Sequence, residues 1–246
     1  MPSNKVRTRF APSPTGYMHV GNLRTALYTY LMAKHEDGTF ILRIEDTDQG
    51  RYVEGAVDVI YNTLREAGLN WDEGPDIGGP VGPYVQSERM GMFKQYAEQL
   101  VAEGKAYPCF TTDEELRALE AVDKKAEVKS REWTEETEAE QKAAMRRLRE
   151  FTIEDVERNL AAGNRFVLRI LADGDPEKKT PFTDLVKGKL EIPENDEDFV
   201  LLKSDGIPTY HFAHAVDDHL MRTTHVIRGE EWLRCAHLLY IKFEIG

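Results

Sequence analysis

The sequence contains very few cysteines. Its two, Cys109 and Cys235, lie far apart among 246 residues, and neither belongs to a C-x-x-C pair. A disulfide framework and a zinc ribbon are therefore excluded, and free thiols in a reducing compartment are expected. Also lacking are an N-terminal leader with a cationic and then an apolar region and any apolar stretch near the roughly 20 residues that span a bilayer. We expect a cytoplasmic protein without a membrane contact.

An excess of basic residues is also missing. Lys and Arg number 32 against 44 Asp and Glu, so the formal net charge is −12. Bulk attraction to nucleic acid is thus disfavoured, although a local basic face stays open. The hydrophobic and charged fractions, 41% and 31%, are those of a globular protein and exclude disorder, collagen and coiled coil as descriptions of the whole chain.

The two common nucleotide-binding motifs are absent. No G-x-x-x-x-G-K-[ST] occurs, and the first turn between strand and helix has no G-x-G-x-x-G. That turn is the breaker-rich segment 11–16, preceded by a predicted strand at 5–10 and followed by a predicted amphipathic helix that ends at Asp37-Gly38. A second strand is predicted at 39–44, which makes a βαβ unit and a parallel sheet. The apolar face of the helix is predicted from Leu23, Ala26, Leu27, Tyr30 and Leu31.

The middle of the chain differs in composition. A helix is predicted at 52–67, a surface loop or hinge at 73–83 and a helix at 86–103, after which residues 111–163 hold 25 charged side chains. Capping patterns there, Thr112 with Glu115 and Thr152 with Asp155, predict helix starts. The chain then returns to β composition and to a mixed pattern. We interpret 1–85 and 201–246 as two halves of one α/β domain and 86–200 as an insertion.

The turn at 11–22 predicts a phosphate site. Pro12 and Pro14 stiffen it, Gly16 permits a tight bend, and His19, Gly21 and Asn22 fall where the following helix begins. Free backbone N–H groups, the imidazole and the amide could converge on a phosphate that the helix dipole already favours. The alternative is that His19 is only a helix cap or a surface residue.

Ordered motifs carry a resemblance to a known family. They are RTRFAPSPTGYMHVGN at the start, ILRIEDTD at 41–48, QSER at 86–89, VLLKSDGIPTYHFA at 200–213, VDDHLM at 216–221 and THVIRGEEW at 224–232. The chain resembles class I aminoacyl-tRNA synthetases of the bacterial glutamyl type across roughly 5–232, with 12–22 in the place of their "HIGH" signature. The implied fold is α/β: a Rossmann-like parallel-sheet catalytic domain split by an α+β acceptor-stem-binding insertion.

The resemblance implies ATP-dependent ligation of L-glutamate to tRNA(Glu) through glutamyl adenylate, with Mg²⁺ accompanying ATP. Its implied ATP site, with His19 and Asn22 in the catalytic roles, comprises Pro12, Ser13, Pro14, Thr15, Gly16, His19, Gly21, Asn22, Glu231 and Trp232. Asn22 stands where many of the wider class have a second His. The implied glutamate pocket comprises Arg9, Ala11, Ser13, Glu45, Tyr210, His214 and Arg228. There the arginines suit carboxylates, and Glu45 suits the α-ammonium.

Each pocket residue taken singly has an ordinary structural alternative. An Arg at a strand end can be a surface charge, Tyr210 a core aromatic, and RIEDTD an acidic capping loop. His214 departs from the family, which usually has Asn there, so the polarity of the pocket and its response to pH can differ. Candidate metal ligands are His211, His214, Asp217, Asp218 and His219, but their spacing fits no tetrahedral pattern. Zinc is not predicted, because Cys109 lacks the second Cys that some relatives carry.

The insertion would meet the acceptor stem through basic residues. The candidates are Lys124, Lys125, Arg146, Arg147 and Arg149, with a solvated helix face as the alternative. The second class I signature, a Lys-Met-Ser-Lys-Ser-like loop, does not occur before Gly246. We therefore expect a monomeric catalytic fragment that activates glutamate poorly or not at all by itself.

Three other functions stay open, and a fourth is disfavoured. A glutamyl-queuosine tRNA synthetase-like enzyme shares this core and lacks an anticodon domain. A non-catalytic tRNA- or nucleotide-binding module would explain the missing signature. A glutaminyl enzyme fits less well because its relatives tend to replace the RIEDTD segment. The absent glycine fingerprint disfavours a dehydrogenase-like Rossmann protein.

Overall fold

The computed structural model describes residues 5–111, 149 and 152–229. The Thr112 cap and four of the five basic candidates (Lys124, Lys125, Arg146 and Arg147) lie outside the described residues, as do Glu231 and Trp232. The chain divides into two compact units. One comprises Met1–Tyr96, Lys179–Ile192 and Pro208–Gly246, and the other comprises Ala97–Lys178 and Pro193–Ile207.

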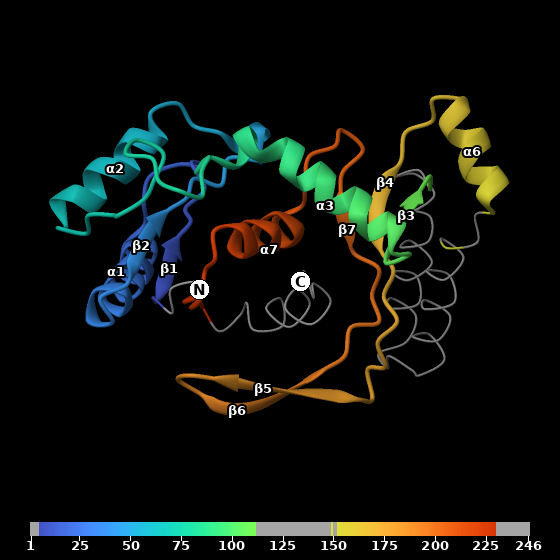
Figure 1. The fold of residues 1–246 in the computed structure, drawn as a ribbon. Coiled ribbons are helices and arrows are strands. Elements are labelled where there is room, and N and C mark those ends of the chain that lie inside the picture. Colours follow the sequence, from blue (N-terminus) through green and yellow to red (C-terminus); the bar gives the residue numbers. More distant parts are fainter. Residues whose placement is uncertain (1–4, 112–148, 150–151, 230–246) are drawn as a thin grey trace, which may run out of the picture. The chain divides into compact units, whose positions relative to one another are not determined.

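The first unit is built on a parallel βαβ unit, as the sequence predicted (Figure 1). Strand β1 (Arg7–Phe10) pairs with β2 (Thr39–Leu42) in register from Arg7↔Thr39 to Phe10↔Leu42, and helix α1 (Val20–His35) connects them. A parallel bridge from Thr8 to His225 lies on the other side of β1. Helices α2 (Ala56–Glu66) and α7 (Tyr210–Leu220) and 3-10 turns at Gln49–Arg51 and Gln86–Arg89 also belong to this unit, and α3 (Met90–Ala102) continues from the second turn.

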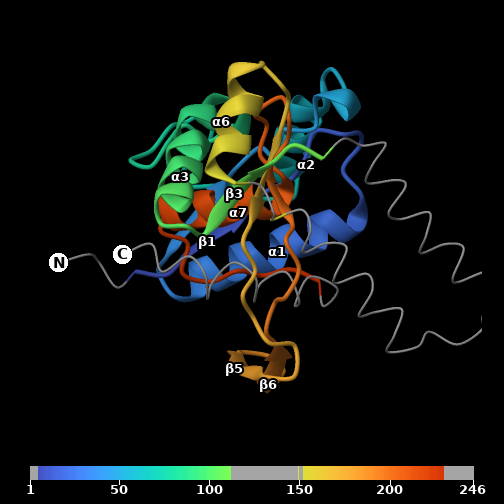
Figure 2. The ribbon, with the colours of Figure 1, turned by 90° about the vertical axis from the view of Figure 1, so that its right-hand side faces the viewer.

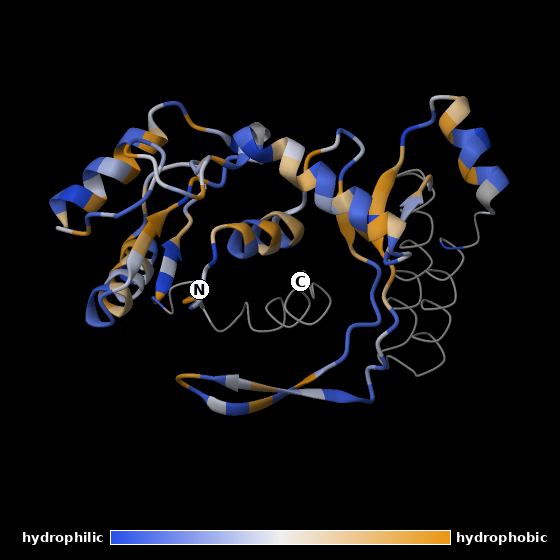
Figure 3. Ribbon diagram, in the orientation of Figure 1, coloured by the Kyte–Doolittle hydropathy of each residue, from blue (hydrophilic) through white to orange (hydrophobic). Residues whose placement is uncertain are grey.

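The two faces of β1 and β2 have different chemistry because successive side chains point to opposite faces. On one face Phe10, Phe40 and Leu42 pack with Ala26 and Ala33 of α1 in the main core; Figure 3 shows the apolar character of β2. The residues between them face the other way: Arg7, Arg9, Ile41 and, just beyond β2, Arg43. Guanidinium groups placed on a buried face need charged partners, and that requirement shapes the site described below.

Helix α1 contacts the sheet through small residues. Ala26, Thr29 and Ala33 are its buried positions, whereas Leu27 and Leu31 are 40% and 50% exposed, so the predicted apolar face was wrong at these two leucines. The hydroxyl of Thr8 donates to the carbonyl of Thr29, a contact that brings the helix backbone close to β1.

The helix is followed by the turn predicted at Asp37-Gly38. Asp37 has φ +47°, and the Gly38 N–H donates to the carbonyl of Ala33. A side chain at Gly38 would overlap the carbonyl of Val6, so this close approach of two backbone segments requires glycine.

The second unit contains an antiparallel sheet. Strand β4 (Val167–Ile170) lies between β3 (Ala106–Cys109) and β7 (Val200–Leu202). Helix α6 (Ile153–Ala161) begins with the predicted capping box of Thr152 and Asp155 and ends before Gly163, which has φ +70°.

Strands β5 (Lys179–Asp184) and β6 (Gly188–Pro193) pair with each other as a separate two-stranded ribbon (Figure 2). Within the described ranges, no helix has both the length and the apolar character needed to cross a membrane.

Candidate functional site

The turn before α1 lies at the carboxyl ends of β1 and β2. The Glu45 N–H donates to the Pro12 carbonyl at 3.0 Å and the Val53 N–H to the Pro14 carbonyl at 2.9 Å, so two backbone bonds attach the turn to the segment after β2. Gly16 has φ +151°, a conformation that other residues rarely adopt, which supports the bend inferred from sequence. Ligands of open parallel sheets bind at this edge, outside the carboxyl ends of the strands.

His19 is the N-cap of α1. Its Nδ1 accepts a hydrogen bond from the Gly21 N–H at 3.1 Å, and its carbonyl accepts from the N–H groups of Asn22 and Leu23. The expectation of free backbone donors is therefore wrong at these three positions, because the cap uses them. Since Nδ1 is an acceptor, a neutral ring carries its proton on Nε2. His19 and Asn22 are exposed, so the imidazole N–H and the side-chain amide are the donors offered here.

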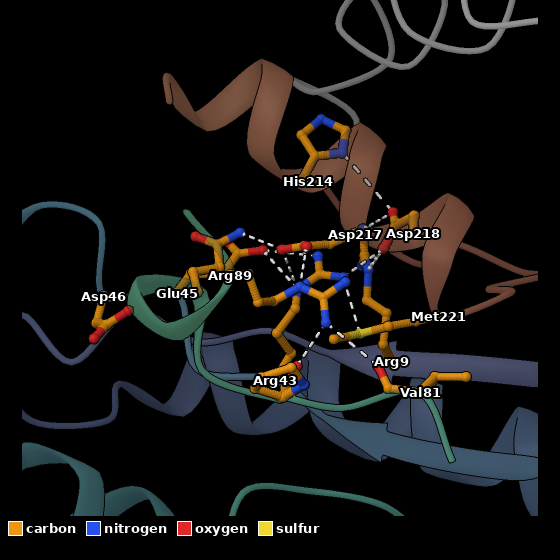
Figure 4. Close-up of polar contacts among 12 residues, drawn as sticks. Arg9, Arg43, Glu45, Asp46, Val81, Arg89, His214, Asp217, Asp218 and Met221 are labelled. Carbon is orange, nitrogen blue, oxygen red and sulfur yellow. Dashed lines mark hydrogen bonds and ion pairs between the residues drawn. The ribbon is translucent and has the colours of Figure 1, made fainter. Parts of the chain in front are cut away.

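A buried network of ion pairs lies on the other face of the sheet (Figure 4). Arg9 on β1 binds both carboxylate oxygens of Asp218 on α7, each at 3.0 Å. Arg43 donates from Nη1 to Asp218 at 2.9 Å and from Nη2 to Glu45 at 2.8 Å. All four side chains are buried. The two arginines on this face of the sheet thus find their counter-charges on α7 and on the segment after β2.

Asp217 extends the network to the QSER segment. Its carboxylate accepts from Arg89 Nε at 2.6 Å and from Gln86 Nε2 at 2.9 Å, and it lies 3.7 Å from Arg43 Nε. Arg89 also donates to the carbonyls of Val81 and Pro83. The QSER and VDDHLM motifs therefore meet through the buried carboxylate of Asp217.

A separate pair of bonds fixes the RIEDTD segment. Asp46 accepts from the Ser87 N–H at 2.8 Å and from the Ser87 hydroxyl at 2.6 Å. Together with the bond from the Glu45 N–H to Pro12, this holds the backbone of Glu45 between the signature turn and the start of the QSER turn.

The network holds three arginines, Arg9, Arg43 and Arg89, against three carboxylates, Glu45, Asp217 and Asp218. Burial alone would raise the pKa of Asp218, but Arg9 and Arg43 hold it well below its usual value. For Glu45, burial outweighs the attraction of Arg43, and its pKa is raised. Burial also opposes the charge of Arg43, yet Asp218, Glu45 and Asp217 raise its pKa. Of Glu45 and Asp218, Glu45 is thus the carboxylate whose charge is less stabilised, and a cationic ligand beside it would stabilise that charge.

Tyr210, His214 and Arg228 lie beside this network. The rings of Tyr210 and His214 are 5.2 Å apart, and His214 Nδ1 is 3.5 Å from Arg228 and 3.8 Å from Asp218. His214 is 2% exposed, and among the described residues its Nε2 has no hydrogen-bond partner. Burial, with Arg228 and Arg9, lowers the pKa of His214 to about 4, against the opposing effect of Asp218.

Tyr210 senses the charges of the network. Its pKa is raised mainly by burial and then by the negative charge of Glu45, while Arg228 and Arg9 oppose this rise. Tyr210 is 40% exposed, so the group opens to solvent at this tyrosine. The structure therefore brings together five of the residues predicted for the pocket, namely Arg9, Glu45, Tyr210, His214 and Arg228.

Five other residues predicted for the pocket and the ATP site lie in the turn before α1. Ala11 is half-buried, Pro12 and Pro14 are buried, and Ser13 and Thr15 are exposed. In the second unit, Arg149 binds both oxygens of Asp198 at 2.6 Å and also the carbonyl of Ala172. Its guanidinium therefore makes an internal contact of the second unit, which the sequence analysis did not predict.

The candidate metal ligands on α7 have other partners. Asp217 and Asp218 bind arginines, as described above. In the described part of the chain, no three His, Cys, Asp or Glu side chains gather as a metal site.

Sequence reasoning missed the residues that hold Arg9 and Glu45 in place. Arg43 binds Glu45 and Asp218, and Asp218 binds Arg9. Behind them, Asp217 with Gln86 and Arg89 closes the network. A signal was present in the alternation of Arg9 and Arg43 with buried apolar residues, which places charge on a covered face.

Comparisons with known proteins agree on one family. A family model described as tRNA synthetases class I (E and Q), catalytic domain, matches residues 5–242. A curated glutamate–tRNA ligase of Clostridium novyi (strain NT) is 54% identical over 237 residues, covering 96% of this chain and 45% of the ligase. Another from Clostridium tetani (strain Massachusetts / E88) is 54% identical over 235 residues, with 95% and 45% covered. The chain thus spans about half the length of the curated relatives it matches.

Solved structures give the same picture. A glutamate tRNA ligase from Elizabethkingia meningosepticum CCUG26117, in complex with its amino acid, matches with a TM-score of 0.83 and 43% identity over 96% of this chain and 46% of that chain. Glutamate-tRNA synthetase from Elizabethkingia anophelis matches with a TM-score of 0.82 and 43% identity, over 96% of this chain and 47% of that one.

Proposed function

The chain belongs to the family of catalytic domains of class I tRNA synthetases (E and Q), and from that premise we propose that it carries the amino-acid-activating site of a glutamate–tRNA ligase. An oxygen of the α-carboxylate of L-glutamate attacks the α-phosphorus of ATP. The bond from that phosphorus to the oxygen bridging to the β-phosphate breaks, and pyrophosphate leaves. A hydroxyl of the terminal ribose of tRNA(Glu) then attacks the glutamyl carbonyl carbon, the bond from that carbon to the phosphate oxygen breaks, and AMP leaves.

One observation carries this proposal: the close grouping of Arg9, Glu45, Tyr210, His214 and Arg228. Glutamate has two carboxylates and one ammonium, so a matching site needs two cations and one anion at fixed positions. Arg9 and Arg228 supply the cations, and Glu45 supplies the anion. The raised pKa of Glu45, caused by its burial, fits a carboxylate that awaits a cationic ligand.

The start of α1 supports the ATP half of the proposal. His19 Nε2–H and the Asn22 amide are exposed donors at the positive end of a helix, where a triphosphate is favoured. Catalysis there consists of positioning and of stabilising charge on the phosphoryl oxygens, so no protein nucleophile is required. Pro12, Ser13, Pro14, Thr15, Gly16 and Gly21 shape the turn, and Glu231 and Trp232 complete the ATP site in this proposal.

Mg²⁺ would reach the site on ATP. The described residues offer no cluster of three candidate ligands, and Mg²⁺ commonly keeps several waters and binds through substrate phosphates. Its chemistry is to neutralise charge on those phosphates. We propose tRNA(Glu), L-glutamate and ATP as its partners, and a cytoplasmic, monomeric protein.

Glutamate-dependent ATP–pyrophosphate exchange tests the proposal. It is run with and without tRNA(Glu), on this chain and on a version extended to include a second-signature loop if the gene encodes one. We expect exchange in the extended form supplied with tRNA and little or none in the 246-residue chain. Binding of tRNA or ATP without exchange in either form would favour the non-catalytic module. Glutamylation of a queuosine-modified tRNA with no charging of tRNA(Glu) would favour the glutamyl-queuosine enzyme.

A further inference from the structure

Arg43 is the residue through which the two charged halves of the site are connected. Its side chain has no exposed surface, so it cannot touch a ligand directly. Nη2 donates to Glu45 Oε1 at 2.8 Å, and Nη1 donates to Asp218 Oδ1 at 2.9 Å. Asp218 in turn holds Arg9 by two bonds of 3.0 Å. One guanidinium therefore fixes the proposed ammonium acceptor and, through Asp218, a proposed carboxylate donor.

These contacts leave atoms for a ligand. Arg43 uses Glu45 Oε1, and Asp218 uses Nε and Nη2 of Arg9. Within the described residues, no hydrogen bond is made by Glu45 Oε2 or Arg9 Nη1. The Glu45 carboxylate and the Arg9 guanidinium are thus each held by the network through some of their atoms, while Oε2 and Nη1 can bind a ligand.

The charge balance explains why this position needs an arginine. Without Arg43, three carboxylates would share Arg9 and Arg89, and one buried negative charge would have no counter-charge. Glu45, whose pKa is already raised by burial, is the group that would take a proton. A lysine restores the charge but has a single nitrogen, whereas the guanidinium addresses two separate carboxylates from a planar fork.

We propose that Arg43 is the positioning residue of the amino-acid site, setting the ammonium and carboxylate subsites together through Glu45 and Asp218. This inference rests on the proposed function. Arg43 would thereby determine the affinity for both the ammonium and a carboxylate of glutamate without contacting the ligand.

The test compares two ligands on the intact chain at pH 7. Calorimetry gives the Kd of L-glutamate and of glutarate, which lacks the ammonium group, and thermal unfolding checks each variant. Glu45→Gln is expected to raise the Kd of glutamate about tenfold, to the Kd of glutarate, and to leave the Kd of glutarate unchanged. Arg43→Lys is expected to raise the Kd of both ligands about tenfold or more. Arg51→Lys, in an exposed pair with Asp48 near the same segment, is the matched control and should change neither Kd.

A second variant keeps the test valid if Arg43→Lys folds poorly. Arg43→Gln combined with Glu45→Gln removes one cation and one anion, so the network stays balanced. Relative to Glu45→Gln alone, it is expected to weaken glutarate about tenfold, because Arg9 loses its indirect support. A lower melting temperature with unchanged Kd values would make Arg43 merely structural and overturn the inference.

The outcomes separate this inference from the proposed function. If Glu45→Gln changes nothing, or the unsubstituted chain binds neither ligand, the assigned site is wrong and the inference falls with it. If Glu45→Gln abolishes the preference for glutamate while both Arg43 variants bind normally, the site stands and only the positioning role is refuted.

Discussion

Replacing His214 by Asn is predicted to remove a specific dependence of stability on pH. His214 faces His211, Tyr210 and Asp218 of its own helix, Arg228 from the segment after α7, and Arg9 from β1. Burial and the two arginines lower its pKa from the usual value of about 6.5 to about 4. The folded protein therefore holds the ring neutral at pH values where the unfolded chain protonates it.

The size of the effect follows from that difference in pKa. Between pH 6.5 and 4 the unfolded state binds more protons at this ring, so stability rises with pH and is lost as pH falls. Between pH 7 and pH 5 the contribution of His214 falls by about 2 kcal/mol. Below pH 4 the loss levels off at about 3 kcal/mol. Asn keeps a polar side chain but does not titrate, so this contribution disappears in the variant.

Urea unfolding at a series of pH values measures the prediction. The free energy of unfolding of the unsubstituted chain should fall between pH 7 and pH 5 by about 2 kcal/mol more than that of His214→Asn. Groups that do not contact His214 titrate alike in both proteins and cancel in the comparison. His35→Asn, at an exposed position, controls for loss of a histidine and should follow the unsubstituted chain. Parallel curves for the unsubstituted chain and His214→Asn would refute the reasoning.

Three further predictions concern the cap, a close backbone approach and the second unit. His19→Asn keeps a capping side chain, so it should preserve stability while slowing ATP–pyrophosphate exchange by the active form of the protein about 100-fold or more. His19→Ala should slow this exchange as well and should also lower stability by about 1 kcal/mol. Gly38→Ala should lower the melting temperature sharply, because its Cβ would overlap a backbone carbonyl, whereas Gly91→Ala, with nothing within 4 Å, should raise stability by about 0.5–1 kcal/mol. Arg149→Met and Asp198→Asn should each lower the melting temperature, and the double variant should lower it by less than the sum of the two single decreases. A decrease in the double variant equal to that sum would contradict a direct interaction between Arg149 and Asp198.

Local rules are enough to predict the elements of the first unit. The Pro- and Gly-rich turn at 11–16, the Asp37-Gly38 stop and the two β-rich runs around the helix predict a parallel βαβ unit, and β1 pairs with β2 in that direction. The capping box at Thr152 is visible for the same reason, since its signal lies within four consecutive residues.

Contacts between distant segments could not be predicted in this way. The pairing of Arg43 with Asp218 joins residues 175 positions apart, and Arg9 with Asp218 joins residues 209 apart. Similarly, the exposure of Leu27 depends on how closely α1 approaches β1 through small residues, which helical periodicity does not specify. The resemblance named the pocket residues, whereas only the structure identified the groups that hold them.

A crystal structure of the chain with a non-hydrolysable glutamyl-adenylate analogue would test the central claim most directly. The account predicts the ammonium of the glutamyl moiety on Glu45, its side-chain carboxylate on one of the two proposed cations, Arg9 or Arg228, and the phosphate mimic beside His19 at the start of α1. Binding of the analogue at any other place, or with the ammonium away from Glu45, would contradict it.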